Sequence, residues 1–188
     1  MIVFFILKSF YRFFDYLRGV KLFIIINLCG GKCRNIPRIG KGVIWKYPPH
    51  QNIILGKNVY IGPYSYIDVP SYASLNIGSS TRLTLGVVLA ANNNIFIGED
   101  VLIAEYCSIR DSEHLYAIDK KINAQGLKTG KIEIRNDVWI GKSSLILGNV
   151  LIENGCIIGA GAFVKDMKCL EYTINVGTPA IVLKKRKF

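Results

Sequence analysis

An aliphatic residue at every sixth position is the feature that most restricts the fold of this 188-residue chain. A period of six matches neither the turn of an α-helix nor the simple alternation of one β-strand. It matches a coil of triangular section, in which each hexapeptide forms one short strand and one corner and about eighteen residues complete a turn. Four runs carry the pattern: Leu55, Ile61 and Ile67; Ile77 and Leu83; Ile97, Ile103 and Ile109; and Ile134, Ile140, Ile146, Ile152, Ile158 and Val164.

Two other positions of the hexapeptide are also restricted. A glycine often follows the aliphatic, as at Gly56, Gly78 and Gly141, and we expect it at corners whose backbone conformations are hard for a side chain to adopt. One hexapeptide buries nothing alone, so the core needs several stacked coils, and the chain supplies about five or six. The sequence predicts an all-β parallel β-helix, and the long run argues against a β-sandwich with accidental spacing. A small or β-branched residue four positions after the aliphatic is expected to face the narrow interior: Val59, Ser65, Thr81, Val101, Cys107, Val138, Ser144, Val150, Cys156 and Ala162.

The first 27 residues predict an amphipathic helix. At about 100° per residue, one half carries Lys8, Arg12, Asp15, Arg18 and Lys21, and the other half is apolar. These charges leave no apolar run near the ~20 residues that a membrane span needs, and the pattern of a signal peptide is missing. An aromatic face opposite a basic face suits a membrane interface, or packing on the protein or a neighbouring subunit, and both interpretations stay open. The apolar half consists of Phe5, Ile6, Phe10, Phe13, Tyr16, Leu17 and Val20.

The repeat is interrupted after Ile109. Leu115 stands at the next expected inward position, but a polar stretch follows and the repeat resumes only at residues 132–134. We expect a loop of about residues 112–131 to leave a corner of the coil, and loops on rigid frames commonly carry function. His114 lies at the root of this loop. An imidazole there suits a general base, because its pKa is ordinarily near neutral, whereas the alternative is a solvated loop histidine.

Two stretches in the second half, "VWIGKSSLILGNVLIENGCIIGAGAFV" and "VGTPAIVLKK", resemble the hexapeptide-repeat acyltransferases, with bacterial polysaccharide O-acetyltransferases the nearest likeness. The resemblance covers roughly residues 40–184. It implies a left-handed parallel β-helix, a hand that general crossover rules would not favour. It also implies a homotrimer with its sites between subunits, and acetyl-CoA as the donor.

The resemblance assigns roles to particular residues. His114 is the implied general base, and "RDSEH" is similar to the family's Asp-x-x-His form, so that Asp111 or Glu113 would hold the imidazole, with Asp111 favoured. The family's Val-Thr-Lys-Asp and the proline pair that follows are not matched around Lys165. This difference weakens the assignment of Lys165 as a contact of the donor. The alternative role of Trp139 is packing. The alternative for the basic tail is contact with solvent or with a membrane. The implied contacts of the donor's pantetheine arm and phosphates are Trp139, Gly141, Lys142, Ala160, Lys165, Lys184 and Arg186.

Charge and cysteine content restrict the partners. The chain has 24 Lys and Arg against 13 Asp and Glu, a net charge of +11 that favours an anionic partner. Nucleic acid is disfavoured, because the charge gathers near the two ends without a recognised motif. Cys29 and Cys33 have no second pair to complete a zinc site, so no metal is expected, and five cysteines without a disulfide framework suit a reducing compartment. The second histidine, His50, is expected to be structural or solvated.

The sequence thus predicts an amphipathic segment (1–30), an acetyltransferase β-helix (31–184) and a basic tail (185–188). The predicted activity is acetyl transfer from acetyl-CoA to a sugar hydroxyl of a cell-surface polysaccharide or its lipid-linked precursor. The alternatives are N-acetylation of an amino-sugar nucleotide and a β-helix that serves only as a scaffold. The expected place is the cytoplasm, at the inner face of a bacterial inner membrane, with peripheral contact through residues 1–27.

Overall fold

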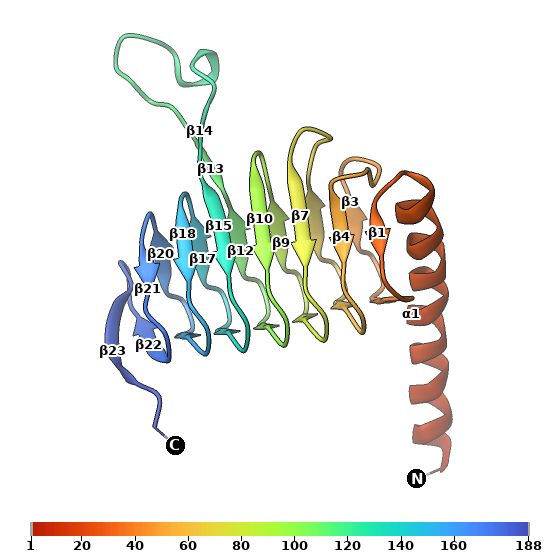
Figure 1. Ribbon diagram of the computed structural model, residues 1–188. Helices are drawn as coiled ribbons and strands as arrows, with labels where there is room; N and C mark the ends of the chain where they lie inside the picture. The colour runs from red at the N-terminus through yellow and green to blue at the C-terminus, as the bar shows by residue number, and fades with distance from the viewer. Residues whose placement is uncertain (1, 188) are drawn as a thin grey trace.

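The computed structural model describes residues 2–187, and their side chains from Ser9 onward. One helix, α1 (Ile2–Leu28), precedes a stack of coils built from short parallel strands (Figure 1). Each full coil gives one strand to each of three sheets, so the stack has three flat sides and three corners. The last coil ends in β23 (Ile181–Lys185), which folds back antiparallel on β22 (Thr173–Val176).

The three sheets follow the order of the strands in each coil. The first sheet holds β1 (Lys32–Cys33), β4 (Ile53–Leu55), β7 (Ser74–Ile77), β10 (Asn94–Ile97), β15 (Lys131–Ile134), β18 (Val150–Ile152) and β21 (Lys168–Cys169). The second holds β2 (Arg38–Ile39), β5 (Tyr60–Ile61), β8 (Arg82–Leu83), β11 (Leu102–Ile103), β16 (Trp139–Ile140), β19 (Ile157–Ile158), β22 and β23. The third holds β3 (Ile44–Trp45), β6 (Tyr66–Asp68), β9 (Val88–Ala90), β12 (Ser108–Arg110), β17 (Leu145–Leu147) and β20 (Phe163–Lys165).

The predicted interior is confirmed. Every aliphatic of the four runs has 0% exposure, and the residues four positions later are buried as well. In the later coils, Ile132 pairs with Val150 and Trp139 with Ile157, a spacing of eighteen residues per turn. Because each inward side chain stacks on its equivalent in the next coil, the core is one continuous column. Truncating such a buried isoleucine to alanine typically costs about 2–5 kcal/mol.

The earlier coils are longer than the repeat predicts, and the extra residues gather at one corner. Tyr60 pairs with Arg82, twenty-two residues on, and Arg82 with Leu102, twenty residues on. The additions lie where the third sheet passes to the first, a corner called here the loop corner, at the top of Figure 1. It is made of the segments 46–52, 69–73, 91–93, 111–130, 148–149 and 166–167.

The glycines after the inward aliphatics have a different role from the one expected. Left-handed backbone occurs two residues later, for example at Asn58, Ser80 and Ser143. A Cβ on Gly141 would instead lie 2.6 Å from the backbone nitrogen of Ala160 in the next coil. These glycines therefore permit the close approach of successive coils, which a side chain would prevent.

The helix α1 packs on the first coil through its C-terminal half. Leu22 and Ile26 are buried, and Gly19 lies against the backbone of Pro37, where a larger residue would collide. Arg18, expected on the polar side, faces the coil and donates through Nε to the carbonyl of Ile39 at 2.8 Å. The predicted aromatic face is thus not the packing face. Phe10 (58%), Phe13 (55%), Tyr16 and Leu17 of this face are exposed, whereas Val20 is partly buried.

Within residues 2–187, no helix combines the length and apolar composition that a transmembrane span requires.

Candidate functional site

His114 lies on an antiparallel hairpin that leaves the loop corner. The hairpin consists of β13 (Ser112–His114) and β14 (Leu127–Thr129), and it closes where the amide of Gly130 donates to the carbonyl of Asp111 at 2.6 Å. The imidazole is exposed beside an open hollow of about 280 Å³ lined also by Tyr116 and Lys128. No hydrogen bond holds the ring within the described part of the chain. The base candidate is therefore open to a substrate.

The loop departs earlier than the repeat indicated. The expected inward residue, Leu115, is 42% exposed, because the chain has already left the coil at Asp111. The repeat returns as expected, with Ile132 and Ile134 fully buried in β15. A long hairpin thus stands on the coil instead of one more inward strand, and Figure 1 shows it projecting from the stack.

The favoured partner of the imidazole, Asp111, is engaged elsewhere. Its side chain is fully buried, and its carboxylate accepts backbone N–H bonds from Asn92 at 2.7 Å and from Asn93 and Asn94 at 2.8 Å. Within the described residues no hydrogen bond joins this carboxylate to His114, so the predicted role of Asp111 in holding the imidazole stays a prediction. The carboxylate lies in the loop corner, where it accepts the hydrogen bonds of three backbone amides.

The second carboxylate candidate, Glu113, lines the same hollow as His114 but is bonded to a lysine. Glu113 accepts from the Nζ of Lys165 at 2.6 Å. This hydrogen bond raises the pKa of the Lys165 ammonium. Lys128 lies 4.0 Å from Glu113 and 3.4 Å from Asp166. Lys165, expected to contact phosphates of the donor, instead ties the root of the hairpin to β20.

A loop residue that the sequence did not single out organises the tip. The side chain of Gln125 accepts from the amide of Ala117 at 2.7 Å and donates to the carbonyls of Ala117 and Lys120 at 2.9 and 2.8 Å. These bonds close the tip around the short 3-10 helix η1 (Ile122–Ala124). Nothing in the local pattern distinguishes Gln125 from the other polar residues of the loop, because its partners depend on how the chain turns.

The residues expected along the pantetheine arm lie at another corner, between the second and third sheets, called here the opposite corner. Gly141 and Lys142 follow β16, and Ala160 lies on the next coil. The amide of Gly161 donates to the carbonyl of Lys142 at 2.8 Å, so the two turns are directly stacked. The Lys142 ammonium is exposed and lies 6.0 Å from the ring centre of Tyr106.

Trp139, Lys184 and Arg186 lie near this corner or at the end of the stack. Trp139 is 51% exposed on the outer face of β16, so its ring is not packed away within the chain. Lys184 lies on β23, in register with Ile174. Arg186 donates to a carboxylate oxygen of Asp137 and to the carbonyl of Gly155, both at 2.9 Å. The basic tail is thus fastened to the coil edge through Arg186.

The two groups of predicted residues do not meet within one chain. His114 stands at the loop corner, whereas Lys142 and Ala160 stand at the opposite corner, with the third sheet between them. Among the described residues, the one hydrogen bond between a predicted catalytic residue and a predicted donor-binding residue joins Glu113 to Lys165.

The second histidine, His50, has hydrogen bonds within the fold. His50 is buried; its Nδ1 accepts from the amide of Asn52 at 3.3 Å, which leaves Nε2 to donate to the carbonyl of Val69 at 3.0 Å. His50 is therefore structural rather than solvated. Within residues 2–187, no three His, Cys, Asp or Glu side chains converge as the ligands of a metal ion would.

The buried thiols are not poised as nucleophiles. Burial raises the pKa of Cys33 to about 11 and of Cys169 to about 12, and it also raises the pKa of Cys107 and Cys156. The Cys107 thiol donates to the carbonyl of Gly141 at 3.1 Å. Since the thiolate is the reactive form, these groups stay protonated and inert near neutral pH.

We expect thiol labelling of the native chain to be confined to Cys29, which is exposed. With a chromogenic disulfide reagent, one thiol per chain should react quickly, and the others should react about 100-fold more slowly or only after unfolding. The variant Cys29→Ser should abolish the fast phase. A second fast thiol, particularly Cys107, would contradict the protonated, buried state.

The family assignment rests on the repeat and on sequence relatives. The family described as "Bacterial transferase hexapeptide (six repeats)" matches residues 131–166. The galactoside O-acetyltransferase of Lactococcus lactis subsp. lactis (strain IL1403) is 30% identical over 146 residues, which cover 73% of this chain and 69% of that protein. The chain belongs to the hexapeptide-repeat acyltransferase family. The hexapeptide repeats make the coil a left-handed β-helix, as predicted.

This hexapeptide-repeat acyltransferase has a longer relative and a similar solved fold. It is 33% identical over 156 residues to the probable acetyltransferase Rv3034c of Mycobacterium tuberculosis (strain ATCC 25618 / H37Rv), covering 82% of this chain and 51% of that protein. The chain thus spans about half the length of that relative. Its fold matches the hexapeptide-repeat-containing acetyltransferase VCA0836 of Vibrio cholerae O1 biovar eltor, complexed with acetyl coenzyme A, with a TM-score of 0.64 and 23% identity over 79% of this chain and 73% of that one.

Proposed function

We propose that the protein transfers the acetyl group of acetyl-CoA to a sugar hydroxyl of a cell-surface polysaccharide or its lipid-linked precursor. The observation that carries the proposal is the exposed imidazole of His114 on a hairpin that stands on a hexapeptide coil. Family membership, the galactoside O-acetyltransferase relative and the acetyl-CoA complex of the VCA0836 fold support the donor and the type of reaction.

The proposed mechanism is direct transfer in a ternary complex. His114 takes the proton of the acceptor hydroxyl while the oxygen attacks the acetyl carbonyl, because a sugar hydroxyl is a poor nucleophile until its proton leaves. A backbone N–H near the opposite corner stabilises the tetrahedral oxyanion. Its collapse breaks the C–S bond, and the imidazolium returns the proton to the departing thiolate. The acetyl ester and CoA are the products, and no covalent enzyme intermediate forms.

We propose that the working form is a homotrimer, with His114 of one subunit facing the opposite corner of another. The separation of the two corners within one chain supports this arrangement, and closed threefold symmetry would build three equal sites. Trp139, Gly141, Lys142 and Ala160 would then line the pantetheine arm. Lys184 is the proposed phosphate contact, since Lys165 and Arg186 already have carboxylate partners.

Peripheral membrane contact through α1 belongs to the same proposal. The aromatic face is not used by the chain's own coil, and Phe10, Phe13 and Tyr16 are exposed on it. Such a face seats a helix in a lipid interface and would bring a lipid-linked saccharide within reach at the cytoplasmic side of the inner membrane.

Calorimetric titration of the purified protein with acetyl-CoA tests the proposal without an acceptor. We expect saturable binding near one molecule per subunit. Absence of binding by a folded oligomer at millimolar donor would favour the scaffold function instead. Once binding is established, rates with an amino sugar and its hydroxyl analogue separate N-acetylation from O-acetylation.

The pair of Glu113 and Lys165 gives a prediction that separates positioning from donor binding. Removing it by Lys165→Met should loosen the hairpin and lower kcat about two- to fivefold, as expected for a partly exposed ion pair. The KM for acetyl-CoA should stay unchanged, and the exchange E113K/K165E should restore much of kcat. A raised KM with unchanged kcat would instead assign Lys165 to the phosphates.

A further inference from the structure

We propose that the hollow between α1 and the first three coils binds the phosphate group of a phosphate ester, such as a diphosphate. Four arginines would hold it: Arg12, Arg34, Arg38 and Arg82. The hollow has a volume of about 690 Å³. The elements that line it lie at the α1 end of the stack, away from the hairpin of His114 (Figure 1). The hollow does not depend on the acetyltransferase activity proposed above.

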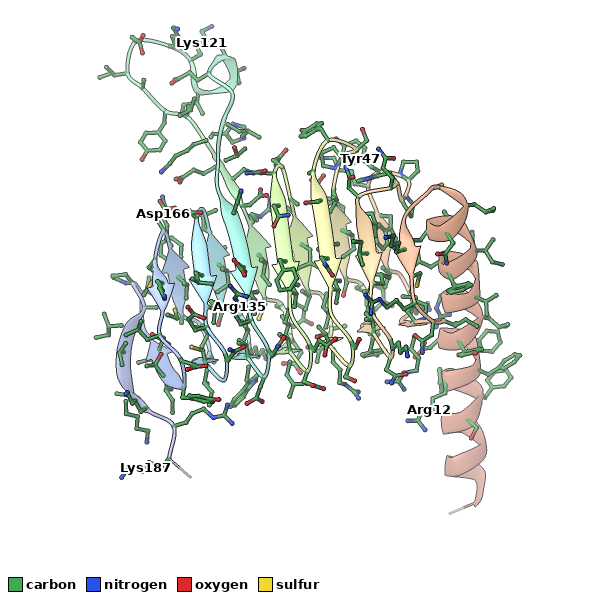
Figure 2. All side chains as sticks on the ribbon, viewed as in Figure 1. Arg12, Tyr47, Lys121, Arg135, Asp166 and Lys187 are labelled. Carbon is green, nitrogen blue, oxygen red and sulfur yellow. The ribbon has the colours of Figure 1, made fainter. Side chains whose placement is uncertain are left out.

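The arginines come from elements that only the fold brings together. Arg12 belongs to α1, Arg34 and Arg38 to the first coil, and Arg82 to β8 of the third. Figure 2 shows Arg12 extending from α1 on the side of the coils. The hollow is thus lined by charges separated by up to seventy positions in the sequence, which is why no local motif revealed it.

A tyrosine holds two of the guanidinium groups in place. Tyr60 pairs with Arg38 on one side and with Arg82 on the other, on three neighbouring parallel strands. The central carbons of the two guanidinium groups lie 4.8 and 5.5 Å from the ring centre. Arg38 and Arg82 lie on strands two positions apart in the sheet, a separation of about 10 Å. Stacking on an aromatic face leaves the N–H edges of a guanidinium free, and these edges match phosphate oxygens.

No described carboxylate forms an ion pair with the arginines of the hollow. Asp15 on α1 pairs with Arg18 instead. No carboxylate is among the described residues that line the hollow. Like charges gathered in one concave place repel one another, and they raise the local concentration of anions.

Phosphate is the anion that suits this arrangement. Guanidinium groups bind phosphate through paired N–H bonds, and a hollow of this size is typical of sites for small ligands. Two sources offer the same chemistry. One is the headgroup of an anionic lipid beneath the exposed aromatic face of α1, to which Tyr16 also belongs. The other is a free phosphate ester in solution.

Titration of the full chain with inorganic pyrophosphate tests the site at physiological ionic strength. We expect saturable binding that the double variant R38Q/R82Q weakens about tenfold or more, because each lost guanidinium removes charge-assisted bonds. The control K131Q/R135Q removes two positive charges from exposed positions outside the hollow and should leave the affinity within about twofold. Acetyl-CoA binding should be unchanged in R38Q/R82Q, which keeps this test independent of the donor site.

Flotation with phosphatidylcholine vesicles, with and without phosphatidylglycerol, identifies the source. Arginine-dependent flotation only with the anionic lipid, competed by pyrophosphate, assigns a lipid headgroup. Pyrophosphate binding without such flotation assigns a free phosphate ester. Equal pyrophosphate affinity in wild type and R38Q/R82Q overturns the proposal. So does loss of acetyl-CoA binding in that variant, or a changed oligomeric state, which would make the hollow part of the donor site or a subunit contact.

Discussion

Replacing His114 by alanine is expected to lower kcat about 10²- to 10⁴-fold while the affinity for acetyl-CoA stays within twofold of wild type. The imidazole is exposed on β13, has no hydrogen bond within the described residues, and faces an open hollow, so its removal disturbs no described contact of the ring. The loss should therefore appear in the chemical step. Release of the CoA thiol with the best acceptor from a sugar screen gives the rate, in a Cys29→Ser background that does not consume the reagent.

The second histidine provides the control for this experiment. His50→Gln removes a buried hydrogen bond to Val69 and should lower the free energy of unfolding, but it lies outside the proposed site. The folded fraction should keep the wild-type kcat. A residual rate above about one tenth in His114→Ala would assign the proton transfer to another group. Equal losses in both variants would mean that the assay reports folding.

The interior could be predicted residue by residue because its cause is local. Each hexapeptide repeats the same strand and corner, so the inward aliphatics recur in the sequence as they do in space, and all of them are fully buried. The first coil is less apparent in the sequence. Cys33, Ile39 and Trp45 keep the six-residue spacing, but only Ile39 is aliphatic. The corner insertions lengthen the early coils without moving the inward positions.

The site was predicted less completely because its contacts are distant in sequence. The loop and the exposed imidazole of His114 were expected, but Glu113 meets Lys165 across fifty-two positions. The face on which α1 packs depends on the contact of Gly19 with Pro37, which no helical wheel contains. Hydrophobic periodicity reports burial along one element, whereas these contacts depend on how separate elements meet.

Asp111 likewise depends on contacts that are distant in sequence, because its carboxylate bonds to the amides of residues 92–94. Asp111→Ala should lower the free energy of unfolding by about 3–5 kcal/mol, because three amide bonds to a fully buried carboxylate are lost and their donors are left unpaired. For a chain of this size the melting temperature should fall by about 10 °C. Thermal unfolding followed by circular dichroism measures the change.

A neighbouring aspartate on the same corner separates this buried role from a general effect of charge. Asp166 accepts one backbone bond, from Asn149 at 2.7 Å, and is exposed, so Asp166→Ala should cost about 1 kcal/mol or less. An Asp111 that served only to orient the imidazole would behave differently. Its removal would lower kcat and leave the melting temperature within about 2 °C of wild type. The expected order, with Asp111→Ala far less stable than Asp166→Ala, assigns the carboxylate to the coil that supports the hairpin.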